Sequence, residues 1–150
     1  MLVFTGRYDY TTDDKGRLSI PARLRDQVTR DGQPLSFFVT VGRKGQLSAY
    51  AEKEYNLLVD ELGSRTDEEA SEALRTITAE TEECPVDAQG RVVLSARLRE
   101  AAQIKRDVVI LGVSKRIEFW DKKAFEAYQG EGAPRIQSAK ATLKGRADLL

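Results

Sequence analysis

The chain has 150 residues, of which 41% are hydrophobic and 32% charged, and its formal net charge is zero, a composition typical of a globular protein with one moderate core or two small ones. It contains no histidine, the commonest general base and metal ligand, and its single cysteine, Cys84, excludes an internal disulfide and a CxxC zinc site. The longest strongly apolar run, Val108 to Val113, has six residues and is too short to cross a bilayer, and no secretory signal is visible, so we expect a cytoplasmic protein.

The first part of the chain predicts a strand, a tight turn, a second strand and a short helix. Residues 7–12 are rich in aromatic and β-branched side chains, which favour a strand. Residues 13–16 have turn chemistry, with an Asp that can bond its own backbone and a Gly that can adopt positive φ. Residues 17–20 resume a strand, and Pro21 suits the first position of a helix.

Residues 35–80 are expected to contain two more strands and two helices. Residues 35–41 and 47–50 predict a hairpin around the glycine-containing residues 42–45. Apolar residues at helical spacing predict one helix over 52–62 and another over 67–80.

The second half predicts the same order of elements. Strands are expected near residues 83–86, 91–94, 108–113 and 117–120, and helices near 96–103 and 122–128. After Gly130 comes a stretch containing Gly and Pro and then a basic segment, which we expect to be partly disordered.

An internal repeat explains this similarity. Residues 13–26 recur, 74 positions later, as residues 87–100, with seven of fourteen positions identical. A repeat of this kind indicates one structural unit used twice. We therefore divide the chain into a first repeat, 1–65, a helical connector, 66–80, a second repeat, 81–129, and a basic tail, 130–150.

Charge is distributed unevenly along the chain. Residues 1–51 carry a net charge of +3, residues 52–87 of −9 and residues 88–150 of +6. Because the affinity of a protein for DNA follows its local density of positive charge, zero net charge does not exclude a DNA-binding protein.

Each repeat contains an Asp-x-x-Gly-Arg turn, which suggests recognition rather than catalysis. The glycine lets the backbone approach another surface closely, and the guanidinium of Arg17 or Arg91 matches phosphate or the O6 and N7 atoms of guanine. Asp13 and Asp87 can hold the guanidinium or cap the turn. The plainer interpretation is a hairpin turn with a solvent-exposed arginine.

Each predicted helix after the turn carries two arginines, Arg23 and Arg25 in the first repeat and Arg97 and Arg99 in the second. Residues two apart on a helix point about 200° away from each other. At most one arginine of each pair can therefore face a nucleic acid, and we include Arg25 and Arg99 as candidate DNA contacts.

The motifs resemble those of the MraZ family. The resemblance rests on Asp13-x-x-x-Arg17 and its repetition as Asp87-x-x-x-Arg91, on Phe4-x-Gly-x-Tyr8, and on the strands at 108–113 and 117–121, so it covers about residues 4–128. It implies an α+β, mainly β, fold like that of AbrB and MazE, in which the tandem repeats form one double-split, swapped-hairpin β-barrel with flanking helices.

The resemblance also implies a function. It implies a transcriptional regulator of the division and cell-wall gene cluster that binds repeated promoter boxes as a ring-shaped homo-oligomer, associated with the nucleoid. The family's DNA-contacting arginine falls on Arg17 and Arg91, and its neighbouring lysine falls on Lys15, with Gln89 in the second copy. The candidate DNA-binding residues are therefore Lys15, Gly16, Arg17, Gln89, Gly90 and Arg91.

Two other functions remain open. One is a MazE-like antitoxin or protein-interaction module, although the tail after Gly130 is short and basic rather than long and acidic. The other is an enzyme with paired carboxylates, for which the sequence offers no histidine and no recognisable catalytic motif. We expect no metal, cofactor, membrane or small-molecule substrate.

Overall fold

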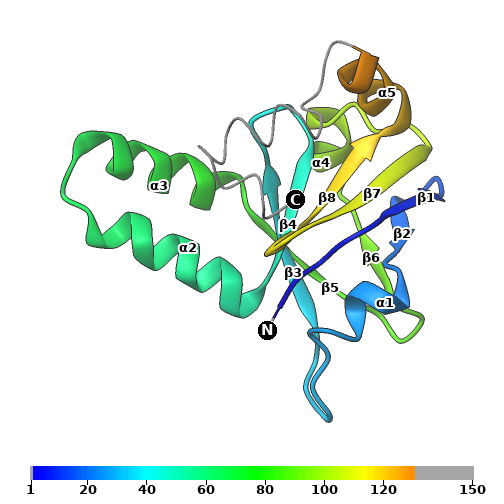
Figure 1. Ribbon diagram of the computed structural model, residues 1–150, viewed down its shortest axis with the longest axis horizontal. Helices are drawn as coiled ribbons and strands as arrows, with labels where there is room; N and C mark the ends of the chain where they lie inside the picture. The colour runs from blue at the N-terminus through cyan, green and yellow to red at the C-terminus, as the bar shows by residue number, and fades with distance from the viewer. Residues whose placement is uncertain (1, 131–150) are drawn as a thin grey trace, which may run out of the picture.

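The computed structural model describes residues 2–130, and Figure 1 shows their arrangement. The first repeat contains β1 (Arg7–Thr11), β2 (Arg17–Ser19), α1 (Ala22–Arg25), β3 (Ser36–Val41), β4 (Leu47–Ala51) and α2 (Glu52–Ser64), followed by α3 (Glu68–Glu80). The second contains β5 (Glu82–Pro85), β6 (Arg91–Val93), α4 (Ala96–Ala101), β7 (Asp107–Val113), β8 (Arg116–Asp121) and α5 (Lys122–Gly130). The predicted types and order are confirmed. The prediction for the tail lies outside the described residues.

Helices α3 and α4 begin where a side chain satisfies one of their first backbone N–H groups. The Asp67 carboxylate accepts a hydrogen bond from the Ala70 backbone at 3.1 Å and caps α3. The Ser95 hydroxyl accepts one from the Leu98 backbone at 3.2 Å and caps α4. The equivalent position in the first repeat is Pro21, and α1 begins without a side-chain cap. Proline serves there because its fixed φ suits a helix start.

The strands of the two repeats exchange partners. The main sheet has the order β1-β7-β8-β4-β3-β5, so the leading strand of each repeat pairs inside the other repeat. Strands β2 and β6 pair with each other as a separate two-stranded antiparallel sheet, which we call the ribbon. This exchange is the predicted swapped-hairpin arrangement. Among the described residues β1 and β5 remain the edges of the six-stranded sheet, so the observed ladders do not close a barrel.

An approximate two-fold axis relates the repeats. Leu18 lies opposite Val92 in the ribbon, and Ser48 lies opposite Glu118 in the main sheet. The two members of each pair are equivalent positions of the repeat, so the axis passes through both pairs.

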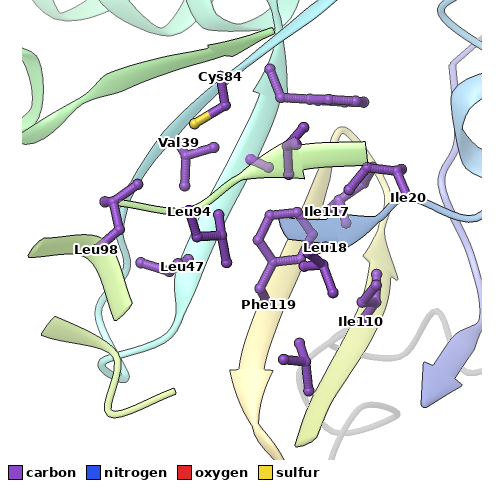
Figure 2. Close-up of a cluster of buried hydrophobic side chains, with 14 of the residues drawn as sticks. Leu18, Ile20, Val39, Leu47, Cys84, Leu94, Leu98, Ile110, Ile117 and Phe119 are labelled. Atoms are coloured by element: carbon purple, nitrogen blue, oxygen red, sulfur yellow. The ribbon is translucent and has the colours of Figure 1, made fainter. Parts of the chain in front are cut away.

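Both repeats contribute to one core. Leu18, Leu24 and Leu98 are completely buried and Ile20 nearly so, and Figure 2 shows such side chains from the ribbon, the helices and the main sheet in one cluster. Because the leading strand of each repeat pairs inside the other repeat, neither repeat can bury its apolar face alone.

The outer face of the main sheet is covered differently in each repeat. Phe38 stacks on Tyr55 of α2 with ring centroids 4.8 Å apart, and Trp120 packs edge-on against Phe125 of α5 at 5.3 Å. Helix α2 continues into α3, and this helical hairpin extends on the side away from the ribbon (Figure 1). No helix in residues 2–130 has the length and apolarity needed to span a membrane.

Candidate nucleic-acid interface

The two Asp-x-x-Gly-Arg turns have the same backbone geometry. In the first, the Asp13 Oδ1 atom accepts hydrogen bonds from the backbone N–H groups of Lys15 at 3.0 Å and Arg17 at 2.9 Å. In the second, Asp87 Oδ1 accepts the equivalent bonds from Gln89 and Arg91, both at 2.9 Å. Each aspartate therefore closes its own turn, as a short acceptor side chain can.

The same aspartates also orient the arginines. Arg17 donates from Nε to the Oδ2 atom of Asp13, and Arg91 donates from Nε to Oδ2 of Asp87 at 2.9 Å. The backbone N–H of the arginine, followed by its guanidinium, lowers the pKa of each aspartate. The carboxylates therefore stay ionised near neutral pH. Each accepts its side-chain hydrogen bond from Nε of the arginine rather than from the two terminal nitrogens, Nη1 and Nη2, which we call the terminal fork.

Both arginines lie on one face of the ribbon. Arg17 pairs with Val93 and Ser19 pairs with Arg91, whereas Leu18 and Val92 between them point into the core. Alternate residues of a strand face opposite sides, so the outer face of the ribbon consists of Arg17, Ser19, Arg91 and Val93. Arg17 and Arg91 therefore occupy diagonal positions on this face.

The glycines of the turns are buried inside the molecule. Gly16 has φ of +79°, and a Cβ built on it would lie 2.2 Å from the Leu94 carbonyl oxygen and 2.9 Å from Nε of Arg99. Gly90 has φ of +81°, and its Cβ would lie 2.6 Å from Cζ of Arg25. The close approach that glycine allows is thus made between the two repeats. Direct contact of these glycines with DNA stays a prediction.

Arg25 and Arg99 cover the turn of the opposite repeat. Arg25 donates from Nε to the Ile20 carbonyl at 2.8 Å, and Arg99 donates to the Leu94 carbonyl at 3.0 Å. These bonds place Arg25 over Gly90 and Arg99 over Gly16. Each end of the ribbon therefore combines a turn from one repeat with a helix arginine from the other.

The remaining helix arginines lie elsewhere, as their spacing predicts. Arg97 pairs with the Glu82 carboxylate at 2.7 Å and donates to the Glu80 carbonyl, while Arg23 is exposed on the other side of α1 from Arg25. The structure thus brings Arg25 and Arg99, rather than Arg23 and Arg97, to the two turns.

The two ends of the ribbon differ in how firmly the arginine is held. Gln89 Oε1 accepts a hydrogen bond from the terminal nitrogen Nη2 of Arg91 at 3.1 Å. Lys15 has no acceptor to offer in the equivalent place, and within residues 2–130 the terminal nitrogens of Arg17 make no hydrogen bond. Among the described residues, the two turn arginines therefore differ in one contact: a terminal nitrogen is engaged in Arg91 and none is in Arg17.

A family model described as "MraZ protein, putative antitoxin-like" matches the chain twice, over residues 3–76 and 77–146. The chain belongs to the MraZ family. Among its relatives are three proteins named Transcriptional regulator MraZ. That of Heliobacterium modesticaldum is 34% identical over 143 residues, 94% of this chain and 96% of that protein. That of Nocardia farcinica is 37% identical over 131 residues, 86% and 88% of the two chains, and that of Pelotomaculum thermopropionicum is 38% identical over 133 residues, 87% and 88%.

Two residues on the outer face of the ribbon, Ser19 and Val93, lie outside the Asp-x-x-Gly-Arg motif and were not among the predicted DNA contacts. Each lies between or beside the arginines, and Val93 is 55% exposed although it is apolar. Period-two alternation with Leu18 and Val92 indicates their outward orientation, but only the pairing of β2 with β6 places them beside the arginines.

No rival site competes with the ribbon among the described residues. A hollow of about 840 Å³ is lined mainly by residues 27–36 and 51–54 and contains neither turn. Residues 2–130 contain no group of three His, Cys, Asp or Glu side chains arranged to hold a metal ion. Cys84 is buried, and burial raises the pKa of its thiol to about 11, so it is not a reactive nucleophile near neutral pH.

Proposed function

We propose that this protein is a transcription regulator without enzymatic activity, which binds double-stranded DNA sequence-specifically through the outer face of the ribbon and its two flanking turns. The observation that carries the proposal is the presence of two aspartate-oriented guanidiniums, Arg17 and Arg91, on one solvent-facing surface. Membership of the MraZ family, with relatives named transcriptional regulators, supports it.

The ribbon is a pair of antiparallel strands, and the major groove of DNA admits a two-stranded β-ribbon. The terminal fork of arginine can donate two hydrogen bonds to guanine O6 and N7, a contact that discriminates between bases by about 1–3 kcal/mol. Lys15 at the adjacent turn tip supplies a phosphate contact, and Gln89 contacts either phosphate or adenine. Arg17 is the main reader because within residues 2–130 its terminal nitrogens make no hydrogen bond, whereas Nη2 of Arg91 donates to Gln89; Arg91 reinforces it.

The arrangement of charge orients the molecule on DNA. The ribbon and its turns lie in basic segments, whereas residues 52–80, which form the α2–α3 hairpin, carry nine acidic and three basic residues. The hairpin extends on the side away from the ribbon (Figure 1). A polyanion repels the hairpin and attracts the ribbon, so a chain of zero net charge can still bind DNA with one face.

The size of the ribbon implies that several copies act together. Two turns offer few contacts, and linking several such modules raises affinity through effective concentration. The family resemblance supports a ring-shaped homo-oligomer on repeated promoter boxes of the division and cell-wall gene cluster, and hence a location at the nucleoid. Each copy then contributes one ribbon to one box.

The test compares two arginines of the same chain. We expect Arg17→Ala to weaken binding to the DNA upstream of the protein's own gene by about 10- to 100-fold, because one bidentate base contact is lost. Arg23→Ala removes the same charge from an exposed position away from the turns, and we expect it to change affinity little. Gel shifts at fixed salt, with circular dichroism and gel filtration of each variant, make the measurement.

Three results would count against the proposal. Equal binding by Arg17→Ala and the parent would show that Arg17 is not a reader. Equal affinity of the parent for upstream and unrelated DNA would exclude sequence-specific recognition. The antitoxin-like description of the family keeps the protein-interaction alternative open, and co-purification with a toxin, without DNA binding, would favour it.

A further inference from the structure

Val93 is the only apolar side chain on the outer face of the ribbon. It is 55% exposed, and it lies directly opposite Arg17. Its neighbour Val92 fills the core from the same strand, so β6 does not need an outward apolar residue for burial. The equivalent residue of the first repeat is Ser19, which is exposed and lies opposite Arg91. An apolar group at this place therefore distinguishes one end of the ribbon from the other.

Among base edges in the major groove, the 5-methyl group of thymine is the apolar feature, and apolar side chains contact it. Val93 is a cross-strand neighbour of Arg17, so their Cβ atoms lie about 4.5–5.5 Å apart. That separation corresponds to about one or two base steps of 3.4 Å. We propose that Val93 is a specificity-determining residue that contacts the methyl group of a thymine adjacent to the base bound by Arg17.

This inference rests on the proposed function and makes it more specific. The end of the ribbon with Lys15, Arg17 and Val93 recognises a base together with a neighbouring thymine. The end with Gln89, Arg91 and Ser19 has a hydroxyl in the equivalent place and is indifferent to a methyl group there. The two halves of the pseudo-symmetric ribbon therefore read different sequences, and the preferred box is not a palindrome.

A different role for Val93 is to pack against the aliphatic stem of Arg17. Packing of that kind would affect thymidine and deoxyuridine duplexes alike, because the valine would act only through the arginine and would not touch the methyl group. Contact with a thymine methyl group would affect only duplexes that carry the methyl. Deoxyuridine pairs like thymidine and lacks only this group, so it separates the two roles.

The experiment first maps the bound box by footprinting on the DNA upstream of the protein's own gene. It then replaces each thymidine of that box by deoxyuridine, one at a time, and measures the affinity of the parent, Val93→Ser and Val3→Ser for each duplex. Val93→Ser copies the residue found in the first repeat, and Val3 is an exposed valine outside the ribbon. We expect one replacement to lower the affinity of the parent about fourfold. That thymidine should lie beside the base that Arg17 contacts. Val93→Ser should lose this sensitivity, and Val3→Ser should keep it.

The outcomes are distinct. If Val93→Ser binds the thymidine and deoxyuridine duplexes with equal affinity while the parent prefers the thymidine duplex, Val93 does contact the methyl group. If the parent shows no sensitive thymidine beside the Arg17 contact, or Val93→Ser retains the parent's sensitivity, the inference is wrong while the proposed function stands. If the parent binds no DNA specifically, both are wrong.

Discussion

At one end of the ribbon Lys15 is exposed beside an arginine whose terminal nitrogens make no hydrogen bond in the described structure. At the other end Gln89 accepts a hydrogen bond from Nη2 of Arg91. The backbone of the two turns is the same, since both turns are closed by an aspartate and both glycines adopt positive φ. The repeats therefore share the turn-forming side chains and the arginine after each turn, and differ in the exposed residue beside that arginine, Lys15 or Gln89.

This comparison separates structural from recognition residues. Buried equivalents such as Leu18 and Val92, or Leu24 and Leu98, remain apolar in both repeats. On the outer face of the ribbon Ser19 corresponds to Val93. Core positions are constrained by packing, whereas exposed positions change at little cost in stability, so the difference between the two ends of the ribbon costs the fold little.

The largest expected effect tests whether the two repeats share the core equally. Leu24 and Leu98 are both completely buried at equivalent positions. We expect Leu24→Ala and Leu98→Ala each to lower the free energy of unfolding by about 2–5 kcal/mol, because each leaves a cavity. Urea unfolding followed by circular dichroism measures both. A loss in one variant with no loss in the other would show that the repeats contribute to the core unequally.

The next effect concerns the close approach of the repeats at the turn. Gly16 and Gly32 both have positive φ, +79° and +70°, but only Gly16 has atoms near its missing Cβ. We expect Gly32→Ala to cost about 1–2 kcal/mol for backbone strain alone. Gly16→Ala should cost about 1–3 kcal/mol more, because its Cβ overlaps the Leu94 carbonyl. The same urea measurement applies, and equal losses would show that the ribbon adjusts without strain.

A smaller effect tests the difference between the two turn tips. We expect Gln89→Lys to strengthen DNA binding about three- to tenfold, because it releases Nη2 of Arg91 and adds a phosphate contact. The dependence of log affinity on log salt should steepen by roughly 0.9. Lys15→Gln is the matched reverse change and should weaken binding and flatten the salt dependence. Salt titrations of both variants that overlap the parent would exclude phosphate contacts at the turn tips.

The smallest effect is the pH dependence of the aspartates. Hydrogen bonds from the arginines lower the pKa of Asp13 and Asp87 in the folded state. Their contribution to stability is therefore complete above the unfolded pKa of about 3.9 and is lost as pH falls through the lower folded pKa. The urea concentration at the unfolding midpoint of the parent should fall as the pH is lowered from about 4, and that of the double variant Asp13→Asn, Asp87→Asn should fall less. An equal loss in both would assign the pH dependence to other carboxylates.

Much of the molecule is readable from the sequence. The repeat at 13–26 and 87–100, the turn chemistry and the apolar periodicity predict the order of elements correctly, because these are local signals. The MraZ resemblance predicts the swapped hairpins. The structure modifies this interpretation at Gly16 and Gly90, which approach the opposite repeat rather than lying at the surface.

Sequence alone determined that one unit occurs twice, that each copy contains a turn beginning at Asp13 or Asp87, and that each turn ends in an arginine. Only the tertiary structure decided that both arginines share one face, that Arg25 and Arg99 cover each other's turns, and that Val93 lies opposite Arg17. The physical reason is that turns and helices depend on neighbours in the chain. The face presented by a strand depends on its register with a partner more than 70 residues away, here β6 paired with β2.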